Sequence, residues 1–138
     1  MPVCKVVDSW ALLAWIRNEG PTAHVQHILQ QADEGEVQLL MSWINVGEVY
    51  YMLARKHGER VADEFLLRLP SLPIGLVEPD EHAIIAAAKL KSTRRISYAD
   101  GFAAALARKE NATLVTGDPE LKAMGDMVAI EWIGLGFN

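Results

Sequence analysis

The sequence has little cysteine and no long apolar run. Its 138 residues include one cysteine, Cys4, so no disulfide can form within the chain, and a reducing compartment is favoured. No apolar stretch approaches the roughly 18 residues that a membrane-spanning helix needs. The N-terminal residues also lack the basic and then apolar pattern of a signal peptide. We therefore predict a cytoplasmic protein that does not cross a membrane.

Several catalytic and nucleotide-binding motifs are also missing. The sequence contains no phosphate-binding P-loop, no Gly-x-Gly-x-x-Gly and no Gly-x-Ser-x-Gly, which disfavours nucleotide-binding folds and serine hydrolases. The net charge of −5 argues against a general nucleic-acid coat, but it is compatible with a nuclease that gathers its acids in one metal site. The histidines show no metal-ligand spacing with the acids, and we interpret them as ordinary helix residues: His24, His27, His57 and His82.

Short β-branched runs alternate with helical segments along the chain. The pattern predicts strands at 3–7, 37–41, 74–77, 113–115 and 127–130, and helices at 10–16, 23–32, 43–57, 59–69 and 81–91, after Ser97 and from Pro119. This alternation predicts one α/β domain, residues 1–138, with a parallel sheet covered by helices on both faces. The apolar first strand is expected at the centre of the sheet, and the helix at 43–57, which is apolar almost all round, is expected to be buried. The alanines of the helix after Ser97 predict a closely packed neighbour.

Four acidic residues stand where a parallel sheet would bring them to one edge. Asp8 ends the first strand, Asp118 follows the fourth strand, and Glu48 lies two turns into the helix that follows the second strand. Asp100, near the start of its helix, can face the same edge. Taken singly, Asp8, Asp100 and Asp118 are each also explained as helix caps, whereas Glu48 lies on an apolar helix without a local cation.

Gathered carboxylates need a counter-charge. Two of them about 4 Å apart repel by roughly 4 kcal/mol at an effective dielectric constant of 20. Oxygen ligands without histidine or cysteine suit Mg²⁺ or Mn²⁺ rather than zinc. The sequence therefore predicts a divalent metal site at this edge of the sheet.

With these residues identified, the chain resembles the PIN-domain family, and within it the VapC-type toxins of toxin–antitoxin pairs. The resemblance covers essentially the whole chain and rests on residues 6–9 with 11–14, 45–48, 96–107 and 114–121. It implies a three-layer α/β/α fold with a parallel sheet of order 3-2-1-4-5. It also implies a Mg²⁺- or Mn²⁺-dependent endoribonuclease, a homodimer and a small cognate antitoxin. The catalytic and metal-binding residues that it implies are Asp8, Glu48, Asp100 and Asp118.

Several neighbouring residues are candidates for orienting the acids or binding RNA phosphate. Ser9, Asn45, Ser97 and Thr116 lie beside the acids in the sequence, with helix capping as the alternative explanation and the favoured one for Ser97. Lys89, Lys91, Arg94 and Arg95 would grip the RNA backbone or belong to a solvated loop.

Two further positions and one further function stay open. Trp10 stands where the family commonly has a small or polar residue, and it is expected to narrow the mouth of the site. Glu120 is either an additional acid or a favourable residue at a helix N-terminus. The alternative function is a non-catalytic PIN-like module that binds RNA or a protein, and a DNA or flap nuclease is a further alternative. The predicted groove for an antitoxin helix lies between the helix at 23–32 and the pair at 43–69.

Overall fold

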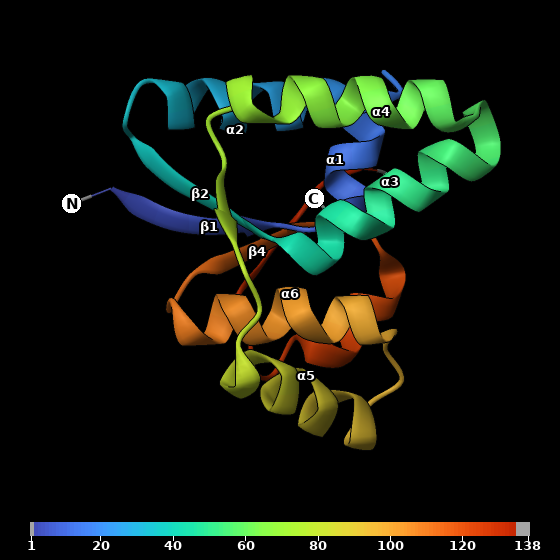
Figure 1. Cartoon of the computed structure of the whole chain (residues 1–138). Coiled ribbons are helices and arrows are strands. Elements are labelled where there is room, and N and C mark those ends of the chain that lie inside the picture. Colours follow the sequence, from blue (N-terminus) through green and yellow to red (C-terminus); the bar gives the residue numbers. More distant parts are fainter. Residues whose placement is uncertain (1, 135–138) are drawn as a thin grey trace.

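Five short parallel strands form the central sheet of the computed structural model, which describes residues 2–134. The strands are β1 (Val3–Val7), β2 (Val37–Ser42), β3 (Gly75–Val77), β4 (Thr113–Thr116) and β5 (Ile130–Trp132). Their order, β3-β2-β1-β4-β5, confirms the predicted topology and the central place of β1 (Figure 1). The ends of the predicted domain, residue 1 and residues 135–138, lie outside the described part of the chain.

Helices cover both faces of this sheet. One face carries α1 (Ser9–Ile16), α2 (Thr22–Asp33), α3 (Trp43–His57) and α4 (Glu59–Arg68); the other carries α5 (Glu81–Thr93) and α6 (Tyr98–Lys109) (Figure 1). Two short 3₁₀ helices, η1 (Leu69–Ser71) and η2 (Pro119–Met124), complete the connections. Within residues 2–134, no helix is both long enough and apolar enough to cross a lipid bilayer.

Adjacent residues of β1 belong to different cores, as expected for a strand that is covered on both faces. Val7 packs into the cluster formed with α1, α2, α3 and α4, whereas Val6 packs into the cluster formed with α6 and η2. Val6 lies in register with Leu40 of β2 and Leu114 of β4, so the second core extends across the three central strands. The edge of the sheet at which these strands end is therefore held in place from both sides.

The small residues of α6 allow the close packing that the sequence predicted. A Cβ atom added at Gly101 would lie 3.0 Å from the carbonyl oxygen of Ala87, so α5 approaches the backbone of α6. Ala103, Ala104 and Ala107 are completely buried. This packing fixes the position of α6, whose first turn carries Asp100.

Three features differ from the sequence predictions. The last strand begins at Ile130 rather than Met127, because the backbone N–H groups of Met127 and Val128 bond to the carbonyl of Met124 and prolong the turn after η2. The outer face of α3 is exposed at Trp43 and Tyr51, because its neighbours α1, α4 and α6 leave one side uncovered. The prediction that α3 is buried all round is therefore wrong.

His24 is the third feature, because it takes part in an ion network instead of being an ordinary helix residue. Its Nε2 lies 2.7 Å from Oε2 of Glu131, whose Oε1 accepts a 2.6 Å hydrogen bond from Nζ of Lys5. Lys5 is on β1, Glu131 is on β5 and His24 is on α2, so the network joins the central strand, an edge strand and a covering helix. These contacts lower the pKa of Glu131 against the opposing effect of its burial.

The tight packing of α6 gives a stability prediction. Ala104→Leu should lower the free energy of unfolding by about 1–3 kcal/mol, because added methyl groups cannot enter a filled core without strain. Ala23→Leu, at an exposed position of α2, is the matched control and should leave it nearly unchanged. Urea denaturation followed by circular dichroism measures both, and equal stabilities would contradict the account of the α6 packing.

Candidate metal centre

Asp8 is the most deeply buried of the four acids. It follows β1 and caps α1: its Oδ1 accepts a 2.9 Å hydrogen bond from the N–H of Ala11, and its Oδ2 accepts one from the hydroxyl of Thr116. Its exposed fraction is 1 %. Burial raises the pKa of Asp8 to about 7, and the charges of Asp100 and Asp118 add to the rise, although the two hydrogen bonds oppose it.

Thr116 links Asp8 to Asp118. The hydroxyl that donates to Asp8 also accepts a 3.0 Å hydrogen bond from the N–H of Asp118, so one side chain at the end of β4 fixes two acids. Asp118 caps η2 by accepting the N–H of Glu120 at 3.0 Å. Both predicted caps, Asp8 and Asp118, are therefore present, and the capping geometry is also what orients these carboxylates.

Asp100 is placed by a reciprocal cap at the start of α6. The Ser97 hydroxyl accepts the N–H of Asp100 at 3.0 Å, and Oδ2 of Asp100 accepts the N–H of Ser97 at 3.4 Å. The predicted capping role of Ser97 is thus confirmed. The pKa of Asp100 is raised to about 6, first by burial and then by the negative charge of Asp118, with a smaller contribution from Glu48 and against the hydrogen bonds to Ser97.

Glu48 reaches the other acids from α3. It accepts a hydrogen bond from the Ser9 hydroxyl at the start of α1. One turn earlier on the same helix, the fully buried Asn45 donates from Nδ2 to the carbonyl of Ala99 at 3.1 Å, which ties α3 to the residue before Asp100. Ser9 and Asn45 therefore hold the helices that carry the acids, and any contact of theirs with RNA stays a prediction.

The arrangement fits a hard divalent cation. Carboxylate oxygens of Asp100, Asp118 and Glu120 lie within 4.8 Å of one another, close enough for a single ion. No ion pair among residues 2–134 includes any of the four predicted acids. Burial first, and then the neighbouring negative charges, raise the pKa values of Asp8 and Asp100, so a bound cation would favour their charged forms. A set of oxygen donors alone suits Mg²⁺ or Mn²⁺.

A cavity of about 770 Å³ opens over these acids. Glu48, Asp100, Asp118 and Glu120 line one part of it, whereas Asp8 is not among the lining residues. Trp10 forms another part of the wall and packs against Gly117, where an added Cβ would lie 2.2 Å from its ring. The Trp10 ring fits at this position because Gly117 has no side chain.

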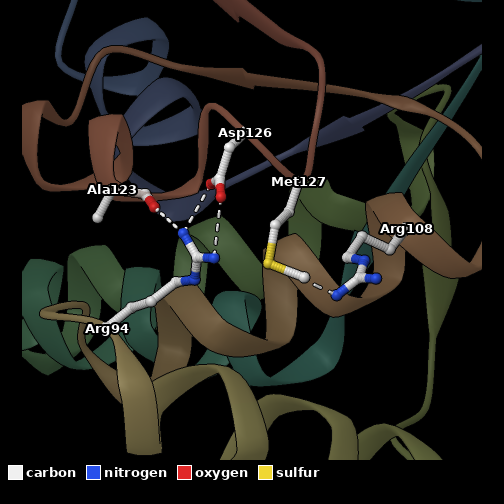
Figure 2. Close-up of polar contacts among 5 residues, drawn as sticks. All are labelled: Arg94, Arg108, Ala123, Asp126 and Met127. Carbon is white, nitrogen blue, oxygen red and sulfur yellow. Dashed lines mark hydrogen bonds and ion pairs between the residues drawn. The ribbon is translucent and has the colours of Figure 1, made fainter.

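None of the predicted basic RNA contacts lines this cavity. Lys91 donates from Nζ to the carbonyl of Ile96, and Lys89 and Arg95 are exposed. Arg94 forms a two-pronged pair with Asp126, at 2.6 and 3.0 Å, and donates to the carbonyl of Ala123 at 2.6 Å (Figure 2). This pair fastens the end of η2 to the turn before α6, and the contact of these residues with RNA stays a prediction.

Arg17, a charged residue of the cavity wall, was not singled out from the sequence. It follows the last turn of α1 and lines the cavity at the opposite end of that helix from Ser9. Its position could have been predicted from the sequence. Ser9, Leu13 and Arg17 are spaced four residues apart, and residues at this spacing share one face of a helix.

The comparisons with known proteins agree with this geometry. The PIN domain family model matches residues 5–127, and the chain belongs to this family. No curated protein matches the sequence. Among solved structures, VapBC2 from Rickettsia felis, bound to a DNA fragment from its promoter, has a TM-score of 0.72 at 17% identity, over 95% of this chain and 99% of that one.

Two further structures are similar over nearly the whole chain. VapC20 from Mycobacterium tuberculosis, a toxin that cleaves the sarcin–ricin loop, has a TM-score of 0.69 at 17% identity, over 88% of this chain and 95% of that one. FitAcB from Neisseria gonorrhoeae has a TM-score of 0.66 at 22% identity, over 91% and 95%. At these identities, the similarity shows that the PIN fold is shared.

The raised pKa values give a pH prediction for the metal-free protein. Unfolded aspartates titrate near pH 4, so between about pH 4 and 7 the folded state binds more protons than the unfolded state. The free energy of unfolding in EDTA should therefore fall as the pH rises from about 4 to 7, by an amount on the order of 3–4 kcal/mol for Asp8.

Denaturant titrations across this pH range, with Asp8→Asn alongside, check the pH prediction. The substitution removes one of the two titrating groups, so the dependence should become weaker and keep only the part due to Asp100. Asp33→Asn, which changes an exposed carboxylate at the end of α2, is the matched control and should leave it unchanged. A stability that is constant or that rises over the same range would contradict the buried placement of Asp8.

Proposed function

We propose that this protein is a Mg²⁺- or Mn²⁺-dependent endoribonuclease and the toxin of a type II toxin–antitoxin pair. The observation that carries the proposal is the approach of acids from separate elements at one edge of the sheet, where no ion pair of the described residues includes any of the four. Asp8 follows β1, Glu48 is on α3, Asp100 is on α6 and Asp118 follows β4. Membership of the PIN-domain family supports a nuclease.

Asp100 and Asp118 are the residues that would hold the ion, with Glu48 and Glu120 beside them in the cavity. A bound divalent ion supplies Lewis acidity toward the phosphodiester and a more acidic water for its hydrolysis. The chain itself supplies orientation. Thr116 fixes Asp8 and Asp118, and Ser9 fixes Glu48. Backbone N–H groups of capped turns fix one carboxylate oxygen each of Asp8, Asp100 and Asp118. Asp8, which is buried and does not line the cavity, would add negative charge beside these residues once it ionises.

The proposed toxin role is supported by solved structures of similar fold. Similar structures include VapBC-1 from nontypeable Haemophilus influenzae and a toxin–antitoxin complex from Klebsiella pneumoniae. We propose a cognate antitoxin helix for the surface of α2, α3 and α4, where apolar side chains are exposed at Tyr51, Leu66 and Leu67. The homodimer and the cytoplasmic location remain predictions from the sequence.

Metal binding should stabilise the folded protein. Saturating Mg²⁺ or Mn²⁺ should raise the Tm of the wild type, since an ion at 100 times its Kd adds about 2.7 kcal/mol to the free energy of unfolding. Asp100→Asn should lose most of this response. Asp80→Asn changes a helix cap that lies outside the acidic cavity and should retain it. An unchanged Tm in the wild type would count against the metal site.

RNA cleavage tests the activity itself. The wild type should cut RNA in Mg²⁺ or Mn²⁺ and not in EDTA, and Asp118→Asn should slow cleavage by more than about 100-fold, because even changes behind metal ligands cost 10- to 100-fold. Asp80→Asn should cut as the wild type does. RNA that is bound and left intact would instead support the alternative, a non-catalytic binding module. Cleavage of DNA alone would assign the activity to the DNA or flap nuclease class.

A further inference from the structure

The acidic cavity continues along α1 to Arg17. Ser9, Leu13 and Arg17, which share one face of the helix, all line it. Arg17 follows Ser9 by eight positions, so it lies about 12 Å farther along the helix axis at 1.5 Å per residue. The acids of the candidate metal centre stand at the end of the cavity near Ser9, and Arg17 stands at the other end, where Glu19 also lines the wall.

The side chain of Arg17 lacks a partner in the described part of the chain. Its Nε is buried and makes no hydrogen bond, and no ion pair among residues 2–134 includes it. Glu19, the acid nearest in sequence, also lines the cavity but does not pair with it. A buried donor without an acceptor costs free energy, and the forked guanidinium matches the two oxygens of a phosphate.

The wall between the two ends is largely apolar. Trp10, Leu13 and Ala14 come from α1, and Met52 comes from α3 on the facing side. Aromatic and apolar side chains of this kind accept nucleobases, because each base has an extended π surface. The cavity therefore offers cation-attracting acids, then an apolar wall, then a cationic side chain. Successive phosphates of single-stranded RNA could then meet a cation held at the acids and the side chain of Arg17, while the base between them meets the apolar wall.

We propose that Arg17 binds a backbone phosphate that flanks the cleaved bond, so that the cavity holds RNA by two phosphates. This inference rests on the proposed ribonuclease function for the identity of the ligand. The separation of about 12 Å along α1 assigns Arg17 to a phosphate other than the one held at the acids. Trp10 then lies beside the intervening nucleotide and contributes to binding rather than only narrowing the mouth.

Substrate length separates this contact from a general effect of charge. With a mixed-sequence RNA decamer and Mg²⁺, Arg17→Gln should raise KM by about tenfold and leave kcat nearly unchanged, since the lost contact is made equally before and during reaction. With a dinucleotide, which is too short to span the cavity, the variant and the wild type should behave alike. Arg60→Gln, at an exposed arginine of α4, is the matched control for loss of a positive charge.

The salt dependence identifies the ligand as a phosphate. Arg17→Gln should reduce the slope of log affinity against log salt by about 0.7, the value for one phosphate contact of a single strand. Arg17→Lys keeps the charge and loses the fork, so it should retain the slope and show an intermediate KM. If Arg17 contributed only packing, the salt slope of both variants would equal that of the wild type.

A measurement of RNA binding without metal tests the contact independently of catalysis. Fluorescence anisotropy with a labelled RNA decamer in EDTA, in an Asp100→Asn background, should show weaker binding and a shallower salt slope when Arg17 becomes Gln. If the wild type cuts no RNA, the proposed function fails and this measurement alone decides the Arg17 site. If Arg17→Gln matched its reference protein in KM, affinity and salt slope, the proposal would be overturned. Arg17 would then be assigned to a carboxylate of a protein partner instead.

Discussion

Mutual repulsion among carboxylates that are held close together and away from water is the constraint on which the rest of this structure depends. Asp8 and Asp100 are almost completely buried, and each is raised in pKa first by burial and then by its acidic neighbours. Such a cluster costs free energy in the absence of a cation. The polar contacts around it explain how the fold tolerates that cost: backbone N–H groups and the hydroxyls of Thr116 and Ser9 donate to the carboxylates.

The topology places this cluster of acids at the edge of the sheet where the parallel strands end. β1 and β4 are neighbours, so Asp8 and Asp118, which follow them, come together although 110 positions separate them in the chain. The helices bring the other two acids, with Asn45 joining α3 to the first turn of α6. Outside the site, Arg94 fastens η2, and the network of Lys5, Glu131 and His24 fastens β5. The rim of the cavity is therefore braced by contacts that do not enter it.

Much of the fold followed from the sequence, and so did the approach of Asp100 and Asp118 at one edge of the sheet. The alternation of apolar runs with capped helices predicted the parallel sheet, and the family resemblance supplied its strand order. The capping box of Ser97 was equally plain, since it depends on residues three apart.

What could not be predicted depends on tertiary contacts. The exposure of Trp43 and Tyr51 follows from which faces of α3 its neighbours leave uncovered, and a composition-based burial estimate does not contain that information. The pairing of Arg94 with Asp126 and of His24 with Glu131 joins residues far apart in the chain. Arg17 escaped notice because its importance comes from its lack of a partner, which only coordinates reveal.

The central claim is that one divalent ion binds among these acids and balances their negative charge. Proton release on metal binding measures this most directly. Calorimetric titration of Mn²⁺ in two buffers of different ionisation enthalpy counts the protons that leave as the ion binds. Because the pKa values of Asp8 and Asp100 are raised to about 7 and about 6, binding near pH 6 should release protons, and this release should vanish well above pH 7. Binding without proton release near pH 6, or no binding at all, would contradict the account.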